Sequence, residues 1–431
     1  MQLSELKNKK LVFFFPYYGV GGVQVYFVRT ALYLEKQGYD IALVDYKNGY
    51  MHQSLPDTSS IEIIFFDHEK GAQIPENAVL IMQLLPPWSL RLEYKNLMIP
   101  DDTQLFFLTT HQGNILPAMP KFRHITTRIY WKSRAIWGSI LRVEYQRSKW
   151  LLKLLANHDA IGFINGATKR NIEQAFNYKF KEGLFAPNQS DYPKQNFYLK
   201  EFKQKKELQL AWVGRISDFQ IHIINRVIQD LDKYAADHQC VIQFHITGYG
   251  DQEEHLKQPK SDFLSIHRIK HIWPDKLPEF SSQMDGFFAM GIAALDAAIL
   301  GVPTMCLNFS YEPIAAGYKY HFLYEMSEYD TCEQILSPSY KAGTHSMDDI
   351  MHQVINNKEA LSKKTYAYFK KNHAIEHTSS LLLDLLAKSR LRWEELKGKK
   401  ELNSLFFSLY KKWETFRAKK RVEDHVVVKA S

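Results

Sequence analysis

Short, continuous apolar runs alternate with helix-like segments along both halves of the chain, and this alternation limits the possible folds. In the first half the runs are KLVFFFPYY, YDIALVDY, IEIIFF, AVLIMQL and QLFFLTT, and the helix-like VQVYFVRTALYLEKQG follows the first of them. Strands that are apolar along their whole length are typical of parallel sheets with helices on both faces. The first half therefore predicts a doubly wound α/β domain.

The same alternation resumes after the polar, lysine-rich segment YLKEFKQKKE. The later runs are LQLAWVG, CVIQFHITGYG, FLSIHRIKHIW, DGFFAM and TMCLNFS, with IHIINRVIQDLDKYAADH as a helical segment after the first. A length of 431 residues also exceeds what one hydrophobic core usually supports. We predict two Rossmann-like domains at residues 1–200 and 201–365, followed by C-terminal helices and a basic tail at residues 366–431.

The ends of the chain and its cysteines predict the compartment. The N-terminal MQLSELKNKK leads directly into LVFFF without the pattern of a signal peptide, and no run approaches about 18 apolar residues. Cys240, Cys306 and Cys332 are widely spaced, which predicts free thiols in a reducing environment. We expect a cytoplasmic protein that can lie peripherally on the inner face of the cytoplasmic membrane.

Positive charge is concentrated in two segments, although the net charge of the whole chain is only +8. Lysine and arginine crowd residues 121–153, where Glu144 is the single acid, and they outnumber acids in residues 388–431. Ile129, Ile136, Val143 and Trp150 recur at sevens in the first segment. This pattern fits either an interfacial helix on anionic lipid or a helix packed on its own sheet. No nucleic-acid recognition motif accompanies the charge, so nucleic acid is not an expected partner.

Loops at the carboxyl ends of parallel strands are where such sheets bind ligands. In PYYGVGGVQ, Gly21 and Gly22 lie between a strand and a helix, where backbone amides can face a phosphate or a sugar. A plain tight turn explains the same glycines equally well. Asp45 follows at the distance of a ribose-binding acid in dinucleotide sites. His111 comes directly after QLFFLTT, at the same predicted edge or as a structural histidine.

The second half repeats this arrangement of strand ends. Gly214 and Arg215 follow LQLAWV, and a guanidinium at such a position can bind a diphosphate with two hydrogen bonds or form a surface ion pair. Gly248 follows the next strand, in a loop or in a plain turn. The apolar stretch FFAMGIAALDAAILGVPTM has Gly291 where a helix begins and Asp296 one turn later. A buried acid needs a partner, so this stretch is either a core helix with a hidden partner or a helix whose first turn holds a ligand.

Taken in order, these pieces resemble the GT-B nucleotide-sugar glycosyltransferases, and in particular the retaining family 4 enzymes of bacterial surface polysaccharide synthesis. The resemblance runs over residues 10–385. Six features carry it: a glycine-rich first loop, a histidine after a strand, a proline and asparagine at the domain junction, a Gly-Arg pair, a glycine turn, and an acid-bearing helix that ends in Gly-x-Pro. In this chain they fall on Gly21-Gly22, His111, Pro187-Asn188, Gly214-Arg215, Gly248 with Gly250, and Asp296 with Gly301-Val302-Pro303.

The resemblance implies two Rossmann-like domains that face a cleft, with the nucleotide on the second domain and the acceptor on the first. It implies catalytic roles for His111 and Arg215, and a helix after Gly291 whose amides face the donor diphosphate. No metal and no cofactor are expected, and the partners are a nucleotide-sugar donor, a glycan or lipid-linked acceptor and a membrane surface. The implied donor-binding residues are Gly21, Gly22, Gly214, Arg215, Gln220, Gly248, Gly291, Ile292, Ala293 and Asp296.

Three features depart from the family pattern. One is that Ile292 and Ala293 lack the hydroxyls that precede the acid in a branch of the family with Met-Gly-Thr-Ser at these positions. Phe288 stands where the family often has a glutamate, and Gln220 stands where a lysine usually shares the diphosphate with the arginine. We therefore predict a glycosyltransferase of surface polysaccharide synthesis and keep two alternatives. One is a non-catalytic GT-B protein for binding or assembly, and the other is a nucleotide-sugar epimerase.

Overall fold

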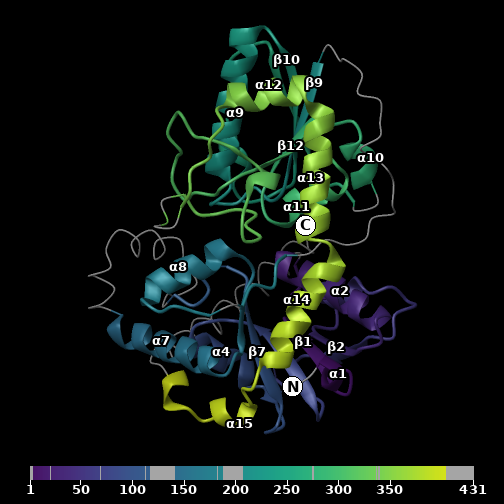
Figure 1. Cartoon of the computed structure of the whole chain (residues 1–431), viewed down its shortest axis with the longest axis vertical. Helices are drawn as coiled ribbons and strands as arrows, with labels where there is room; N and C mark the ends of the chain where they lie inside the picture. Colours follow the sequence, from purple (N-terminus) through teal and green to yellow (C-terminus); the bar gives the residue numbers. More distant parts are fainter. Residues whose placement is uncertain are drawn as a thin grey trace, which may run out of the picture.

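Two six-stranded sheets organise the chain in the computed structural model, which describes residues 3–19, 21–67, 69–111, 113–116, 141–181, 183–187, 207–273, 276–335, 337 and 340–403. The first sheet has the order β3-β2-β1-β5-β7-β8 and the second has the order β11-β10-β9-β12-β13-β14. All neighbours are parallel except β13 and β14, which are antiparallel. The predicted pair of doubly wound units is therefore confirmed (Figure 1).

The strands follow the predicted apolar runs. The first sheet contains β1 (Lys10–Phe14), β2 (Asp40–Asp45), β3 (Glu62–Phe65), β5 (Ala78–Gln83), β7 (Gln104–Thr109) and β8 (Ile161–Phe163). The second contains β9 (Glu207–Val213), β10 (Val241–Thr247), β11 (Leu264–Ile269), β12 (Gly286–Ala289), β13 (Thr304–Cys306) and β14 (His321–Phe322). A separate two-stranded sheet pairs β4 (Ala72–Gln73) with β6 (Leu97–Met98).

Helices cover both sheets. Those of the first half are α1 (Leu3–Leu6), α2 (Gly22–Lys36), α3 (Tyr50–Gln53), α4 (Pro87–Tyr94), α7 (Arg142–Asn157) and α8 (Gly166–Phe176). Later come α9 (Ile221–His238), α10 (Leu277–Ser281), α11 (Ile292–Ile299), α12 (Met347–Asn356), α13 (Lys358–Asn372), α14 (Ile375–Lys388) and α15 (Trp393–Leu396). Single 3-10 turns are η3 (Glu253–His255), η4 (Leu323–Glu325) and η5 (Lys400–Leu402).

The central strands are buried on both faces, as their continuous apolar sequence requires. Along β1, Val12 and Phe14 enter one hydrophobic cluster, whereas Leu11 and Phe13 enter another that includes the inner side of α2. Side chains alternate between the faces of a strand, so both faces must be covered when both sets are apolar. Each sheet is therefore a layer between helices, and only its strand ends are open to ligands.

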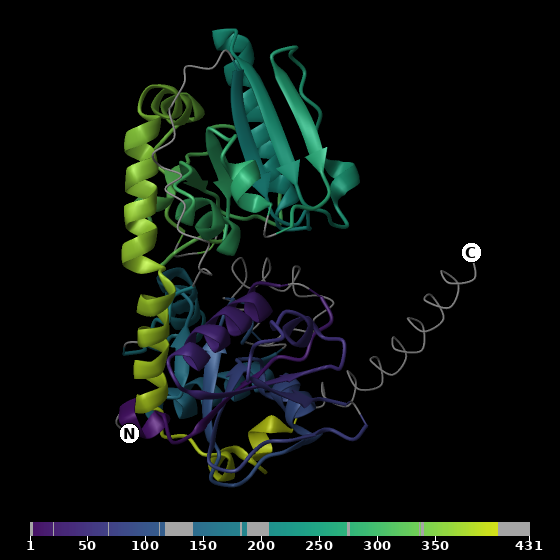
Figure 2. The ribbon, with the colours of Figure 1, turned by 90° about the vertical axis from the view of Figure 1, so that its right-hand side faces the viewer.

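The C-terminal helices connect the two units. Helix α13 packs on α11 of the second unit, and after His373 the chain continues as α14, which packs on α1 and α2 of the first unit (Figures 1 and 2). Gln104 Nε2 donates to the carbonyl oxygens of Leu386 at 2.8 Å and Ser389 at 3.1 Å. The chain therefore returns to the first sheet after completing the second.

The basic segment can be assessed only in part. Helix α7 packs on the first unit through Leu151, Leu152 and Leu155, and Trp150 lies half-buried against the same core. Val143 is exposed, whereas residues 129 and 136 lie outside the described residues, as does the basic tail after residue 403. Within α7 the packing on its own sheet is confirmed, and docking on a membrane stays a prediction. In the part of the chain that the structure describes, no helix is long and apolar enough to cross a membrane.

Candidate functional site

The carboxyl ends of the two sheets face each other. A methyl group in place of the Gly22 hydrogen, at the start of α2, would lie 3.6 Å from Ile292 Cδ1 at the start of α11. The ring of His111, after β7, lies 5.9 Å from that of Phe309, after β13. The loops after β1 and β7 thus meet those after β12 and β13. We call these facing edges the junction, and it brings together the predicted Gly22, His111 and Ile292.

Helix α11 is a core helix with an open first turn. Ala294, Leu295, Ala297 and Ala298 are buried, whereas Gly291, Ile292 and Ala293 are half-buried at the junction. Gly291 has φ 61° and ψ −138°, a conformation that glycine adopts without steric cost. Its lack of a side chain leaves the first-turn amides without a side-chain cap at that position. An anion can therefore approach these amides, which is the chemistry that helix N-termini offer.

Asp296 has its partner in the other unit. Its Oδ1 accepts a hydrogen bond from Arg29 Nη2 of α2 at 3.4 Å, and the two side chains are only 17% and 16% exposed. Burial raises the pKa of Asp296 to about 6, and the neighbouring Arg29 opposes this shift. The acid in the apolar helix is thus satisfied by an ion pair across the junction, which no local sequence pattern predicts.

We expect this acid to give the unfolding free energy a measurable pH dependence. Because the folded pKa of Asp296 lies above its ordinary value of 3.8, its contribution to stability is present below 3.8 and is lost as pH rises through about 6. The free energy of unfolding of Asp296→Asn should therefore fall less as the pH rises, by up to about 3 kcal/mol. Urea denaturation at several pH values measures the slope, with the exposed Asp57→Asn as control. Equal slopes in the wild type and Asp296→Asn would contradict the assignment.

Arg215 is an available cation on the second unit. It is exposed in the loop after β9, directly after Gly214, and it has no ion-pair partner among the described residues. Gln220, five residues later, is buried; it accepts a hydrogen bond from Ser217 Oγ at 2.8 Å. The guanidinium can therefore reach an anion, whereas the Gln220 side chain is engaged within its own loop.

Close packing of the backbone accounts for Gly248. Its φ is 132°, and an added side chain would collide with the carbonyl oxygen of Gly214 in the neighbouring loop. The next glycine of the turn, Gly250, lies equally close to the carbonyl of Ile216. These glycines therefore let the loops after β9 and β10 touch, and a contact of Gly248 with a donor stays a prediction. Gly21 is the extended residue that precedes α2.

His111 is oriented by its own loop. Its Nδ1 accepts a hydrogen bond from the backbone N–H of Gly113 at 3.0 Å, so the neutral ring carries its proton on Nε2. Asp45, which fits the spacing of a dinucleotide site, is fully buried. Its carboxylate accepts the backbone N–H groups of Tyr17, Tyr46 and His52. The Asp45 carboxylate is therefore used inside the fold and does not face a ribose.

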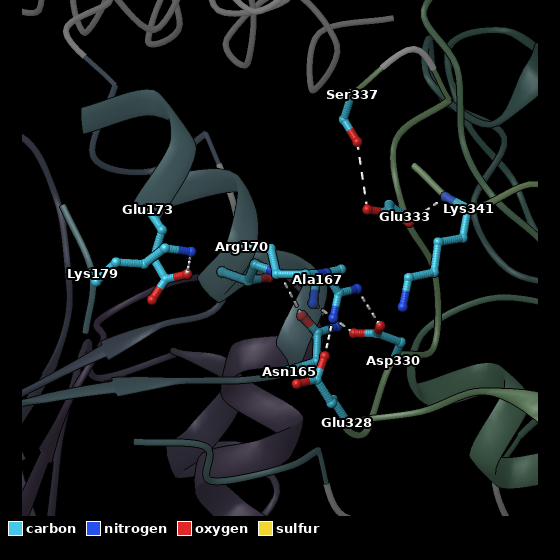
Figure 3. A network of polar contacts seen from close by, with 11 residues as sticks. Asn165, Ala167, Arg170, Glu173, Lys179, Glu328, Asp330, Glu333, Ser337 and Lys341 are labelled. Atoms are coloured by element: carbon cyan, nitrogen blue, oxygen red, sulfur yellow. Dashed lines mark hydrogen bonds and ion pairs between the residues drawn. The ribbon is translucent and has the colours of Figure 1, made fainter. Parts of the chain in front are cut away.

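A second set of polar contacts across the units was not foreseen from sequence. Arg170 of α8 pairs with Glu328, and its Nη2 lies 2.8 Å from Asp330 Oδ2 (Figure 3). Asp330 Oδ1 also accepts the N–H of Ala167 at 2.7 Å, at the start of α8. Burial raises the pKa of Asp330 to about 6. We call Arg170, Glu328 and Asp330 the Arg170 network. No motif signals it, because Arg170 is 158 and 160 residues from the two acids in the sequence.

The expectation of no metal and no cofactor stays a prediction. Within the described ranges, no three His, Cys, Asp or Glu side chains lie close enough together to hold a metal ion.

Comparison with solved structures identifies the fold. A glycosyltransferase from Rickettsia africae ESF-5 superposes with a TM-score of 0.52 at 11% sequence identity, over 91% of this chain and 99% of that chain. The crystal structure of TarM superposes with a TM-score of 0.51 at 9% identity, over 89% of this chain and 99% of that chain. No protein-family model and no curated protein sequence matches the chain. At such low identity the likeness establishes the fold alone, and that fold is GT-B.

Proposed function

We propose that this protein is a glycosyltransferase that moves a sugar from a nucleotide diphosphate sugar to an acceptor at the junction. The observation that carries the proposal is that an exposed cation, Arg215, and the open first turn of α11 follow the neighbouring strands β9 and β12 at the same sheet edge. On the other side of the junction lie Gly22 and His111. Arg215 and the first turn of α11 can bind a diphosphate, and the reacting sugar would lie beside Gly22 and His111.

In this proposal the donor diphosphate binds to the amides of Ile292 and Ala293 and to the Arg215 guanidinium. Negative charge develops on the diphosphate as the bond to the sugar breaks, and preorganised donors that stabilise such charge usually supply the largest catalytic effect. Asp296 Oδ1 already faces Arg29, so a ribose hydroxyl would bond to Oδ2. His111 Nε2–H would donate a hydrogen bond to the sugar.

The finer assignments rest on the resemblance to the retaining family 4 enzymes. They are transfer with retention, a glycan or lipid-linked acceptor, and a role in surface polysaccharide synthesis on the inner face of the cytoplasmic membrane. The concentration of lysine and arginine in residues 121–153 and 388–431 supports attraction to anionic lipid. The proposal involves neither a metal nor a cofactor.

A non-catalytic GT-B binding protein is the second candidate, and Phe288 favours it. This residue is fully buried in β12, so the position where the family often has a glutamate supplies no carboxylate to the junction. Binding of a donor without turnover would identify this alternative.

Calorimetric titration with UDP, GDP, CDP and ADP tests the donor site. We expect one nucleotide diphosphate to bind selectively, and Arg215→Ala to weaken it about tenfold to hundredfold, because charged hydrogen bonds contribute about 1.5–3 kcal/mol. Arg390→Ala is the matched control, since Arg390 is an exposed arginine whose partner, Asp159, belongs to the first unit. Absence of binding for all four nucleotides would refute the proposal, as would equal affinity in Arg215→Ala and the wild type.

A further inference from the structure

Exposed aromatic side chains gather at the carboxyl ends of strands. Tyr17 and Tyr18 follow β1, and Phe65 ends β3, with 48%, 67% and 49% of their surface exposed. On the second unit, Tyr249 and Trp273 follow β10 and β11 and are exposed as well. A folded chain usually keeps large aromatic rings covered, so such a gathering at ligand-binding edges indicates an interaction site.

Two tyrosines at this edge of the first unit, one after β1 and one after β2, form a stacked pair. The rings of Tyr18 and Tyr46 are stacked, with centroids 4.4 Å apart and an angle of 11° between their planes. Tyr46 is backed in turn by Phe66, at 6.0 Å, so the pair rests on the core. We call the stacked pair of Tyr18 and Tyr46 the aromatic platform. Stacking covers one face of the Tyr18 ring, so the exposed surface of this residue is the opposite face and the ring edges.

The backbone of the loops that carry the platform is fixed by hydrogen bonds to Asp45. The buried carboxylate of Asp45 accepts N–H groups from Tyr17 at 3.1 Å, Tyr46 at 2.8 Å and His52 at 3.0 Å. The N–H of Tyr50 donates to the carbonyl oxygen of Tyr17 at 3.0 Å. One carboxylate thus ties the loop after β1 to the loop after β2 and to α3. Rings that are fixed before binding lose little entropy when a ligand stacks on them.

The order of the strands places the platform beside the proposed donor site. Contacts across the junction pair β1 with β12 and β7 with β13, through Gly22 with Ile292 and His111 with Phe309. In the first sheet, β2 and β3 lie on the side of β1 that is away from β7. In the second sheet, β9, β10 and β11 lie on the corresponding side of β12, away from β13. The platform and Arg215 therefore lie on the same side of the junction. Tyr18 is three residues before Gly21, which limits their separation to about 11 Å.

We propose that the aromatic platform binds a sugar ring of the acceptor, so that the acceptor is a glycan whose ring stacks on Tyr18. This inference rests on the proposed function and names its acceptor class. Pyranose rings present flat C–H faces that fit an aromatic ring, and their hydroxyls can bond to the tyrosine hydroxyls at its rim. A lipid surface is a poorer fit, because interfacial docking combines Trp, Phe and Leu side chains with many lysines and arginines on an amphipathic helix, whereas the platform lies in two loops. The platform consists of two stacked tyrosines.

The test uses the full chain on an array of printed bacterial and synthetic glycans, followed by titration of the glycan that binds best. We expect the wild type to bind, and Tyr18→Ala to weaken binding about tenfold, which corresponds to about 1.4 kcal/mol. Tyr18→Phe keeps the ring and should retain affinity within about threefold. Tyr366→Ala, on α13 of the second unit, is the control and should bind like the wild type.

Several outcomes would overturn the platform. These are no binding to any printed glycan, wild-type affinity in Tyr18→Ala, or a Tyr18-dependent loss of binding to phosphatidylglycerol vesicles instead of glycans. Titration with nucleotide diphosphates in parallel separates this inference from the proposed function. Glycan binding that depends on Tyr18 without any nucleotide binding would support the platform and refute the transferase. Nucleotide binding without glycan binding would support the donor site of the proposed transferase and refute the platform.

Discussion

Phe288→Glu is expected to destabilise the second unit by more than about 4 kcal/mol. Phe288 is fully buried in β12, where its ring lies 6.1 Å from that of Phe244 and 6.0 Å from that of Tyr320. A glutamate here removes these contacts and must either bury a charge or take up a proton, and both options are costly. Urea unfolding followed by circular dichroism measures the loss.

Phe288→Leu is the matched control, because it keeps an apolar side chain and should cost less than about 1.5 kcal/mol. A Phe288→Glu variant as stable as the wild type would mean that position 288 reaches the junction after all. Such a variant with increased turnover would further mean that a carboxylate at position 288 takes part in transfer. The expected result is instead that this chain cannot present a carboxylate from that position, so any transfer it performs relies on other groups.

The sequence predicted the repeating architecture well, because burial on both faces leaves a direct mark in the residues. The helix expected at residues 221–238 is α9 without any change of bounds. Strand ends were less certain: KLVFFFPYY continues in apolar letters to residue 18, but β1 ends at Phe14. An apolar pattern does not distinguish the buried Phe14 from the exposed Tyr18. The sequence alone therefore does not show that Tyr18 lies in a loop, where it forms part of the aromatic platform.

The position of the candidate site residues in the fold follows from the sequence only where the signals are local. Glycines at strand ends, Arg215 after β9 and the helix start at Gly291 are visible within a few residues of sequence. The partner of Asp296 is not, because Arg29 lies 267 positions earlier in the chain. Ion pairs of this kind leave no periodic pattern, since they depend on how two complete units dock. The return of α14 to the first unit escaped prediction for the same reason.

The Arg170 network makes this docking testable, and Arg170→Met is expected to lower the free energy of unfolding by about 3–5 kcal/mol. Arg170 is the cation beside Asp330, whose side chain is only 6% exposed, so its removal leaves a buried carboxylate without its counter-charge. Lys179→Met is the matched control from the same region (Figure 3). Lys179 is 89% exposed although it pairs with Glu173, and exposed pairs contribute about 0–1 kcal/mol.

The pH dependence of this loss separates a charge effect from a packing effect. The pKa of Asp330 is raised to about 6, so the carboxyl group is protonated in the folded state at pH well below 6 and no longer needs a cation. The penalty of Arg170→Met should therefore be smaller near pH 5 than near pH 7.5, and Asp330→Asn in the same chain should recover part of it. A penalty equal to that of Lys179→Met at both pH values would show that the two units dock without the help of this ion pair. Small-angle X-ray scattering of Arg170→Met then tests the arrangement itself: if the network fixes the relative position of the units, the variant has a larger radius of gyration while each unit stays folded.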